Sequence, residues 1–192
     1  MTGPTEGSDG HRDPNPGPDT TGPLREHLRT LARHHAWATR RLLDATAGVS
    51  DPDWRRDTRV FFTSLHGTLN HLLLAEERAW WPRFSGEPAE PYASLGDEIE
   101  PARGRLGARL VAAADRWQGF VEALPSARLL GTLDYERRGS RVSLPFAATL
   151  AHVFLHAMHH RGQATAVLTA LGHPCPELDL VRLLQAEQPS AA

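Results

Sequence analysis

Four long stretches of the sequence repeat their apolar residues with the period of an α-helix, and this pattern constrains the fold more than any other feature. The stretches cover about residues 24–47, 60–84, 97–123 and 146–171. An apolar residue at every third or fourth position gives each helix one apolar face, and such faces are buried when helices pack together. The pattern therefore predicts four amphipathic helices that share one core.

The connectors between these stretches are rich in residues that end helices. Gly48 follows the first stretch, and Gly172 and Pro174 follow the fourth. In the segment LLGTLDYERRGSRVSLP, short stretches of alternating apolar and polar residues lie on both sides of Gly139. This pattern predicts a loose hairpin or an extended excursion before the last long helix. Beyond Pro176, the segment PELDLVRLLQAEQ predicts one short extra helix.

We therefore expect an all-α protein with one four-helix bundle over residues 23–187 and a short C-terminal extra helix. Residues 1–22 contain almost no large apolar side chain and are rich in Gly, Pro, Asp and Thr, so we expect a disordered N-terminal tail. Residues 188–192 are expected to form a frayed C-terminus.

Composition removes several classes of function. The chain carries 21 basic and 23 acidic residues, which gives no electrostatic reason to expect a nucleic-acid or membrane partner. All the basic residues are arginine, so a lysine cannot act as a Schiff base or a general base. One cysteine cannot form a disulfide within the chain, and no signal peptide or membrane span is predicted. We expect a cytoplasmic protein.

The segment LAHVFLHAMHHRGQ, residues 150–163, carries four histidines: His152, His156, His159 and His160. A helix advances about 100° per residue, so these four side chains and that of Gln163 fall within about a quarter turn of one another. Several imidazoles on one helix face are costly to bury without partners, and a metal ion is one partner that would satisfy them.

Histidines four residues apart on a helix can bind the same metal ion. The pairs His152/His156 and His156/His160 both have this spacing, and spacing does not choose between them. Among the candidates in the second stretch, His71 lies in an apolar run and is favoured over His66 as the inward-facing third ligand. A hydrogen-bonded histidine network without metal is the alternative.

Two known metal chemistries do not fit this helix. A zinc-protease helix needs Glu directly after its first His, whereas here Val153 and Ala157 follow His152 and His156. A di-iron bundle needs Glu-x-x-His motifs, and the fourth stretch contains no Glu. Three neutral histidines would leave a bound metal its full charge and an open position, which can lower the pKa of a water or hold a thiolate.

The segments GTLNHLLLAEERAWW and HAMHHRGQ, with their order and spacing in the chain, resemble the DinB/YfiT-like proteins, a family with a proposed metal site, over about residues 24–185. The resemblance implies a bundle of up-down-down-up topology, often a homodimer. It also implies a metal site of His71, His156 and His160, a histidine triad with His152 and His159 as pocket-lining or second-shell neighbours.

The chain departs from the family pattern in two places. The segment between His71 and its tryptophans is one residue longer than the pattern. The first helix carries His34 and His35 where the family has an aromatic residue and an asparagine, and His35 is expected to line the pocket or to bond a ligand. Arg161, next to the last ligand, is a candidate partner for a carboxylate, for an anionic ligand or for a surface salt bridge.

The wider superfamily of these proteins includes metal-dependent enzymes that use low-molecular-weight thiols, namely mycothiol-dependent maleylpyruvate isomerase and bacillithiol S-transferases. The resemblance therefore implies a divalent metal (zinc, nickel and iron are not distinguished), with a thiol such as mycothiol as a possible cofactor. A hydrolase or S-transferase acting on a small electrophile is the first functional hypothesis. A non-enzymatic metal-binding stress-response dimer is the alternative.

Overall fold

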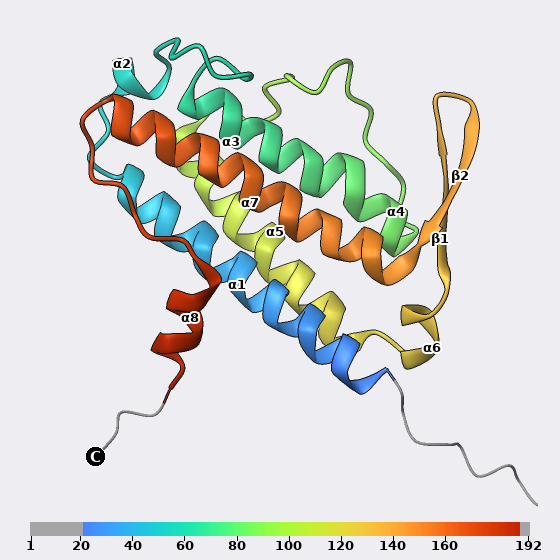
Figure 1. The fold of residues 1–192 in the computed structure, drawn as a ribbon. Coiled ribbons are helices and arrows are strands. Elements are labelled where there is room, and N and C mark those ends of the chain that lie inside the picture. Colours follow the sequence, from blue (N-terminus) through green and yellow to red (C-terminus); the bar gives the residue numbers. More distant parts are fainter. Residues whose placement is uncertain (1–20, 189–192) are drawn as a thin grey trace, which may run out of the picture.

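The computed structural model describes residues 21–188, which fold mainly into helices with one small two-stranded sheet (Figure 1). The expectation of a mainly helical chain is confirmed, and the sheet is the part that an all-α class leaves out. The predicted tail and frayed end lie almost entirely outside the described residues. None of the helices described is long and apolar enough to cross a membrane.

The four predicted helical stretches are all helical in the structure, with boundaries that differ by up to six residues. The long helices are α1 (Gly22–Thr46), α3 (Leu65–Leu74) with its continuations η1 (Ala75–Trp80) and α4 (Trp81–Ser85), α5 (Arg103–Ala123) and α7 (Phe146–Ala170). The shorter helices are α2 (Asp51–Trp54), α6 (Ser126–Leu129) and α8 (Leu180–Ala186). The last of these is the predicted extra helix.

The long helices lie side by side, and their pairing brings chain-distant segments together. Helix α1 packs against α5 and α7, and α3 packs against the same two helices. In Figure 1, α1 and α7 run in one direction, and α3 and α5 run in the other. Buried leucines such as Leu69, Leu73, Leu110 and Leu168 fill the space between them. The contact between α3 and α7 is the one that positions the histidines.

A β-hairpin lies at one end of the helices, where the sequence predicted a hairpin or extended excursion. Strands β1 (Thr132–Arg137) and β2 (Ser140–Pro145) pair in antiparallel register, with Arg137 opposite Ser140. The two-residue turn between them needs a positive φ at both positions, and Arg138 and Gly139 have φ of 52° and 75°. Helix α7 starts directly after β2, so the hairpin adjoins the histidine helix.

Helix α3 begins at Leu65 rather than at residue 60 because Ser64 caps it. The Ser64 hydroxyl accepts a hydrogen bond from the backbone N–H of Gly67. The preceding turn presses against the helix so closely that a Cβ on Gly67 would meet the carbonyl oxygen of Phe62 at 2.1 Å. This close approach holds Phe62 over the first turn of α3.

Helix α5 also begins later than predicted, at Arg103 rather than at residue 97. The backbone of Glu100 is paired with the side chain of Asn70, which accepts from its N–H at 2.9 Å and donates to its carbonyl at 3.1 Å. Because the Asn70 side chain bonds the N–H and C=O of Glu100, these groups are not available for an earlier helical turn, and the segment before Arg103 is not helical.

The segment η1 is a π-helix between His71 and Trp81. A π-helical turn holds one residue more than an α-helical turn, and it accommodates an insertion without breaking the helix. The π-helix lies in the segment where the family resemblance implies one extra residue. Glu76, in this π-helix, points into the protein and is buried.

Candidate metal centre

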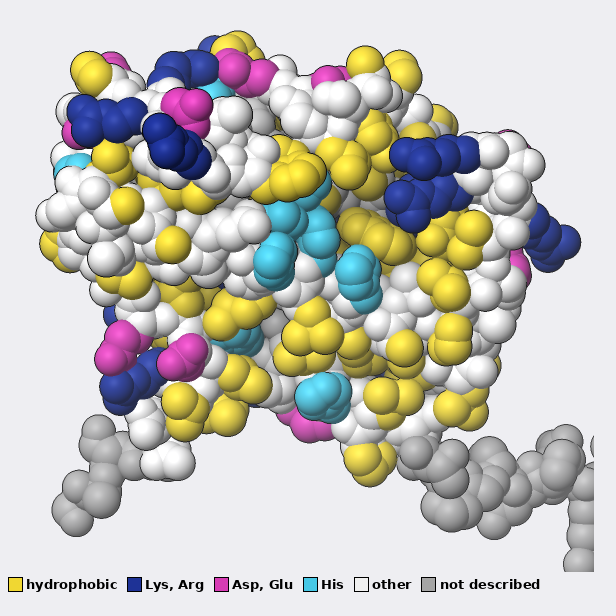
Figure 2. All heavy atoms as spheres, turned by 45° about the horizontal axis from the view of Figure 1, so that its top comes forward, with side chains coloured by type: hydrophobic (Ala, Val, Ile, Leu, Met, Phe, Trp, Pro, Cys, Tyr) yellow, Lys and Arg dark blue, Asp and Glu magenta, His cyan; other side chains and the backbone are white. Residues whose placement is uncertain are grey.

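Helix α7 presents its histidines at the groove beside α3, and they differ in burial. His160 is buried and His156 is half-buried, whereas His152 and His159 are exposed. Figure 2 shows histidine side chains gathered in the middle of one face of the molecule. The predicted stripe is therefore present, but only part of it turns toward the core.

His71 reaches the same groove from α3 and is buried. Its Nδ1 donates a hydrogen bond to the backbone carbonyl of Leu95, at 2.8 Å. This bond puts the ring hydrogen on Nδ1, so the Nε2 lone pair is free and points toward α7. The same arrangement occurs at His160, whose Nδ1 lies 2.8 Å from the side-chain oxygen of Gln163.

The Nε2 atoms of His71, His156 and His160 converge. His156 Nε2 lies 3.4 Å from His71 Nε2 and 3.1 Å from His160 Nε2, and the ligand atoms of all three lie within 4.8 Å of one another. A metal ion about 2.1 Å from each nitrogen in tetrahedral geometry needs nitrogens about 3.4 Å apart. We call these residues the three-histidine cluster, and its spacing could hold a metal ion.

Burial keeps these imidazoles in the neutral form that binds metals. Burial, together with the nearby His160 and His71, lowers the pKa of His156 to about 3. Burial also lowers the pKa of His160 to about 4, against the opposing effect of the Gln163 hydrogen bond. The pKa of His71 is lowered by burial too. At neutral pH the three rings therefore carry no extra proton that a metal would have to displace, and the Nδ1 hydrogen bonds of His71 and His160 leave the Nε2 lone pairs of those two rings available.

Phe62 closes one side of the cluster. Its ring stacks on His71, with centroids 3.8 Å apart and planes 14° apart, and it meets His160 edge-on at 5.5 Å. An aromatic ring in this position orients both imidazoles and keeps water from one side. The sequence analysis did not single out Phe62, since it lies in a turn and carries no chemical group of its own.

The other predicted neighbours fall into two groups. His152 and His159 flank the cluster: the His152 ring lies 5.7 Å from that of His156, and the His159 ring lies 4.8 Å from that of His160. Gln163 contacts both His160 and His159. These residues flank the cluster, and their role as pocket-lining or supporting residues stays a prediction.

Arg161 and His35 lie elsewhere, inside the protein between α1 and α7. Arg161 Nη1 donates to His35 Nδ1 at 2.9 Å, and His35 Nε2 lies 3.3 Å from a carboxylate oxygen of Glu76. Among residues 21–188, no hydrogen bond, ion pair or ring contact joins the side chain of either residue to the three-histidine cluster. Burial lowers the pKa of Arg161 to about 10, and the charge of Glu76 opposes this. The buried arginine is paired with an acid through a histidine, so it forms no surface salt bridge.

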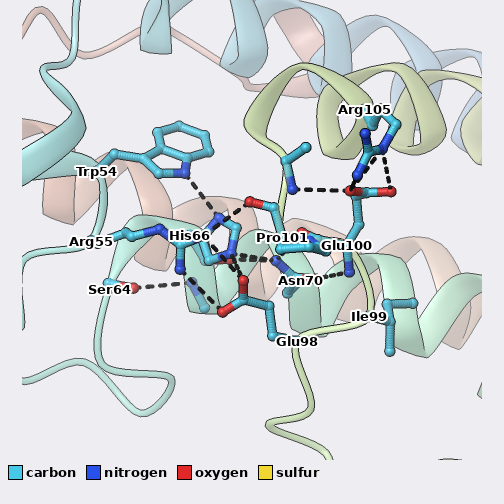
Figure 3. A network of polar contacts seen from close by, with 12 residues as sticks. Trp54, Arg55, Ser64, His66, Asn70, Glu98, Ile99, Glu100, Pro101 and Arg105 are labelled. Carbon is cyan, nitrogen blue, oxygen red and sulfur yellow. Dashed lines mark hydrogen bonds and ion pairs between the residues drawn. The ribbon is translucent and has the colours of Figure 1, made fainter.

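A second buried histidine has a different role (Figure 3). Trp54 Nε1 donates to His66 Nδ1 at 2.9 Å, and His66 Nε2 lies 3.0 Å from a carboxylate oxygen of Glu98. Asn70 lies against the ring and ties it to the backbone of Glu100. We call these five residues the His66 network. Of its members, only His66 was considered as a site residue from the sequence. The four-residue spacing of His66 and Asn70 was its one local signal.

A sequence model of the DinB family matches residues 24–191 of the chain. This range contains all three histidines of the cluster and nearly all of the described structure. Neither the curated proteins nor the solved structures that were searched contain a match to the chain.

Proposed function

The chain belongs to the DinB family, and from this premise we propose that His71, His156 and His160 bind a divalent transition metal that serves a reaction on a small electrophile. The observation that carries the proposal is the convergence of three neutral Nε2 atoms at distances suited to one ion. Two of these atoms are left free because Leu95 and Gln163 occupy the opposite ring nitrogens.

Each residue around the proposed metal position has its own role. His71 and His160 are held rigidly by their outer hydrogen bonds, and His156 lies between them. Phe62 shields the cluster on one side, so a substrate would approach from the exposed side, where His152 and His159 lie. A divalent ion at such a site supplies Lewis acidity, which lowers the pKa of a bound water or thiol.

We propose two reaction classes for this site, metal-dependent hydrolysis and thiol S-transfer. In the S-transfer reaction, a thiolate sulfur of the mycothiol or bacillithiol type forms a bond to a carbon of the electrophile, and the leaving group departs with its electron pair. No carboxylate of the described residues belongs to the cluster, so the chain offers no acid–base carboxylate there. A nucleophile already deprotonated by the metal fits this lack of a base.

The assignment of partners and location rests on the family and the composition. We propose a cytoplasmic homodimer without nucleic-acid or membrane partners. We also infer that the long helices form the up-down-down-up four-helix bundle of the family. The pairing of α1 and of α3 with both α5 and α7 supports this topology.

Metal content and turnover test the proposal together. We expect purified wild-type protein and the His152→Ala variant to retain about one metal ion per chain by elemental analysis, and His156→Ala to lose it. His152→Ala is the matched control because it removes an exposed histidine from the same helix face. Thiol conjugation and hydrolysis are then measured with a panel of thiols and small electrophiles.

The outcomes separate the hypotheses. Turnover that disappears with the metal in His156→Ala supports the enzyme. Metal without turnover across the panel rejects the enzyme in favour of a non-enzymatic metal-binding dimer. A native sample without metal that also fails to take up added zinc, nickel or iron rejects both, and it leaves the histidine network without metal.

A further inference from the structure

A second pocket lies where α4, the connector before α5 and the β-hairpin meet. Its volume is about 390 Å³. The charged residues that line it are Arg83, Arg137, Arg138 and Glu136. Three arginines against one glutamate make this wall positive, although the chain as a whole has a formal net charge of −2. We call it the arginine pocket.

Arg83 is held in the pocket by aromatic rings. Its guanidinium carbon lies 4.8 Å from the ring centroid of Trp80 and 4.5 Å from that of Tyr135. Such contacts orient the guanidinium plane but use none of its N–H groups. Tyr135 and Arg137 are two residues apart on β1, so they point to the same side of the strand. The strand thus brings a ring and a second positive charge to Arg83.

The N–H groups of Arg83 have no acceptor among residues 21–188, and no carboxylate there forms an ion pair with it. Arg109, which is also half-buried, is instead paired with both Glu77 and Glu100. Within the described part of the chain, Arg116 lies over Trp81 without an ion pair, as Arg83 lies over Trp80. Burial lowers the pKa of Arg83, and the charge of Arg137 acts in the same direction. An arginine keeps its proton at neutral pH, and no Arg83 nitrogen is among the buried atoms of residues 21–188 that lack a partner, so its N–H groups can reach water or an anion that enters the pocket.

The arginine pocket adjoins the three-histidine cluster. Leu95 lines the pocket, and its backbone carbonyl accepts the hydrogen bond from His71. On the other side, Trp80 packs on Arg83 and also meets His152 edge-on at 5.1 Å. Figure 2 shows basic side chains on the same face as the gathered histidines, with apolar surface between the two groups. The two sites therefore share neighbouring residues and one face of the molecule.

We propose that the arginine pocket binds an anionic group, a carboxylate or a phosphate, and that Arg83 is its main ligand. Arg137 and Arg138 add positive charge from the hairpin, and the planar guanidinium of Arg83 can give two parallel hydrogen bonds to two oxygens of the anion. For the reaction at the cluster, this names the substrate class: small electrophiles or thiol adducts that carry an acid group. This assignment of the substrate class rests on the proposed function, whereas the proposal that the pocket binds an anion does not.

Calorimetric titration of the full chain, freed of metal, with inorganic phosphate and separately with succinate tests the pocket. We expect at least one of the two anions to bind, with affinity that falls as salt is raised. Arg83→Gln should weaken that binding by at least about tenfold, since it removes a charge-assisted pair of hydrogen bonds. Whichever anion binds identifies the group as a phosphate or as a carboxylate.

Two further variants guard against a folding artefact. Arg41→Gln removes another arginine that packs on a tryptophan, Trp37, away from the pocket, and it should leave anion binding unchanged. Arg137→Gln changes an exposed strand residue, and it should weaken binding by a few-fold, roughly the effect of one longer-range charge. If neither anion binds, or if Arg83→Gln and Arg41→Gln behave alike, the proposal is wrong.

The same titration of His156→Ala separates this inference from the proposed function. Anion binding that persists in His156→Ala and disappears in Arg83→Gln establishes the pocket even if no metal or turnover is found. If turnover is found, Arg83→Gln should raise KM for acidic electrophiles and leave KM for uncharged ones unchanged. An equal rise in both would reject Arg83 as the residue that selects acidic substrates.

Discussion

The three-histidine cluster and the His66 network are both built around buried histidines of α3, yet the ring nitrogens of these histidines have different partners. At His66, Trp54 donates to one nitrogen and Glu98 lies against the other, so protein groups satisfy the ring. At His71, only Nδ1 is used by a protein acceptor, and Nε2 faces two other imidazoles. What distinguishes a candidate metal ligand is therefore a lone pair that the protein leaves unused.

The difference also separates roles in stability and binding. The His66 network joins α2, α3 and the segment before α5, and its loss would leave buried donors without acceptors. The cluster joins α3 to α7 mainly through rings that face one another. We therefore expect changes at His66 to act on folding, and changes at the cluster to act on metal binding.

The largest effect is expected on metal affinity. His71→Ala should lower it by more than about a thousandfold, beyond the roughly 10–100-fold typical of outer-shell changes, because one of three ligands is removed. His66→Ala should leave the affinity within about threefold of wild type. Competition with a chromophoric chelator measures both. Equal losses in the two variants would erase the distinction between the two histidines.

The reverse ranking is expected for folding. His66→Ala should lower the free energy of unfolding of the metal-free protein by about 2–4 kcal/mol, since it creates a cavity and leaves the Trp54 N–H without its acceptor. The exposed His152→Ala should change it by less than about 0.5 kcal/mol. Urea unfolding followed by circular dichroism gives both values. A His66→Ala protein as stable as wild type would show that the network contributes nothing.

An intermediate effect is expected from the outer partner of His160. Gln163→Met keeps the volume of the side chain but removes the acceptor for Nδ1–H, so the ring is no longer held in one tautomer. Metal affinity should fall by about 10–100-fold. Gln118→Met, the same change on α5, is the matched control and should have no effect. An unchanged affinity in Gln163→Met would show that His160 is oriented by packing alone.

Acidification should destabilise the metal-free protein through the cluster. The folded pKa values of His156 and His160, about 3 and about 4, lie below the usual 6.5, so the unfolded state binds more protons between these limits. Their stabilising contribution is complete above pH 6.5 and is lost as the pH falls toward 4, at on the order of 1 kcal/mol per pH unit for each group.

Unfolding midpoints of the metal-free protein at pH 7.5 and pH 5 measure this loss. Replacing both residues, in His156→Gln with His160→Gln, should flatten the dependence on pH. The exposed His27→Gln is the control and should leave it as steep as in wild type. A double variant that keeps the full slope would place the titrating groups elsewhere.

The smallest effect is expected at the exposed edge of the His66 network. Glu98→Gln removes a carboxylate that is 41% exposed and contacts both His66 and Arg55. Ion pairs at this exposure contribute about 0–1 kcal/mol, so stability should fall by less than about 1 kcal/mol. A loss comparable to that of His66→Ala would mean that the carboxylate, rather than the tryptophan donor, holds the ring.

The sequence alone predicted the long helices, the hairpin, the histidine stripe on one face of α7 and the inward position of His71. These features depend on local periodicity, which a sequence carries directly. Spacing left the pairs His152/His156 and His156/His160 equal, and the family resemblance favoured the second. The structure brings His156 and His160 together with His71, and their role as ligands stays a prediction.

Gln163, which orients His160, lies on the same helix, but only the tertiary structure decided which nitrogens of His71 and His66 are free, because their partners come from other elements of the chain. The backbone of Leu95 orients His71, and Trp54 with Glu98 satisfies His66. The arginine pocket likewise exists because the hairpin packs beside α4. Helical periodicity says which way a side chain faces, but long-range packing determines what it meets there, and that determines whether a histidine or an arginine has anything left to bind.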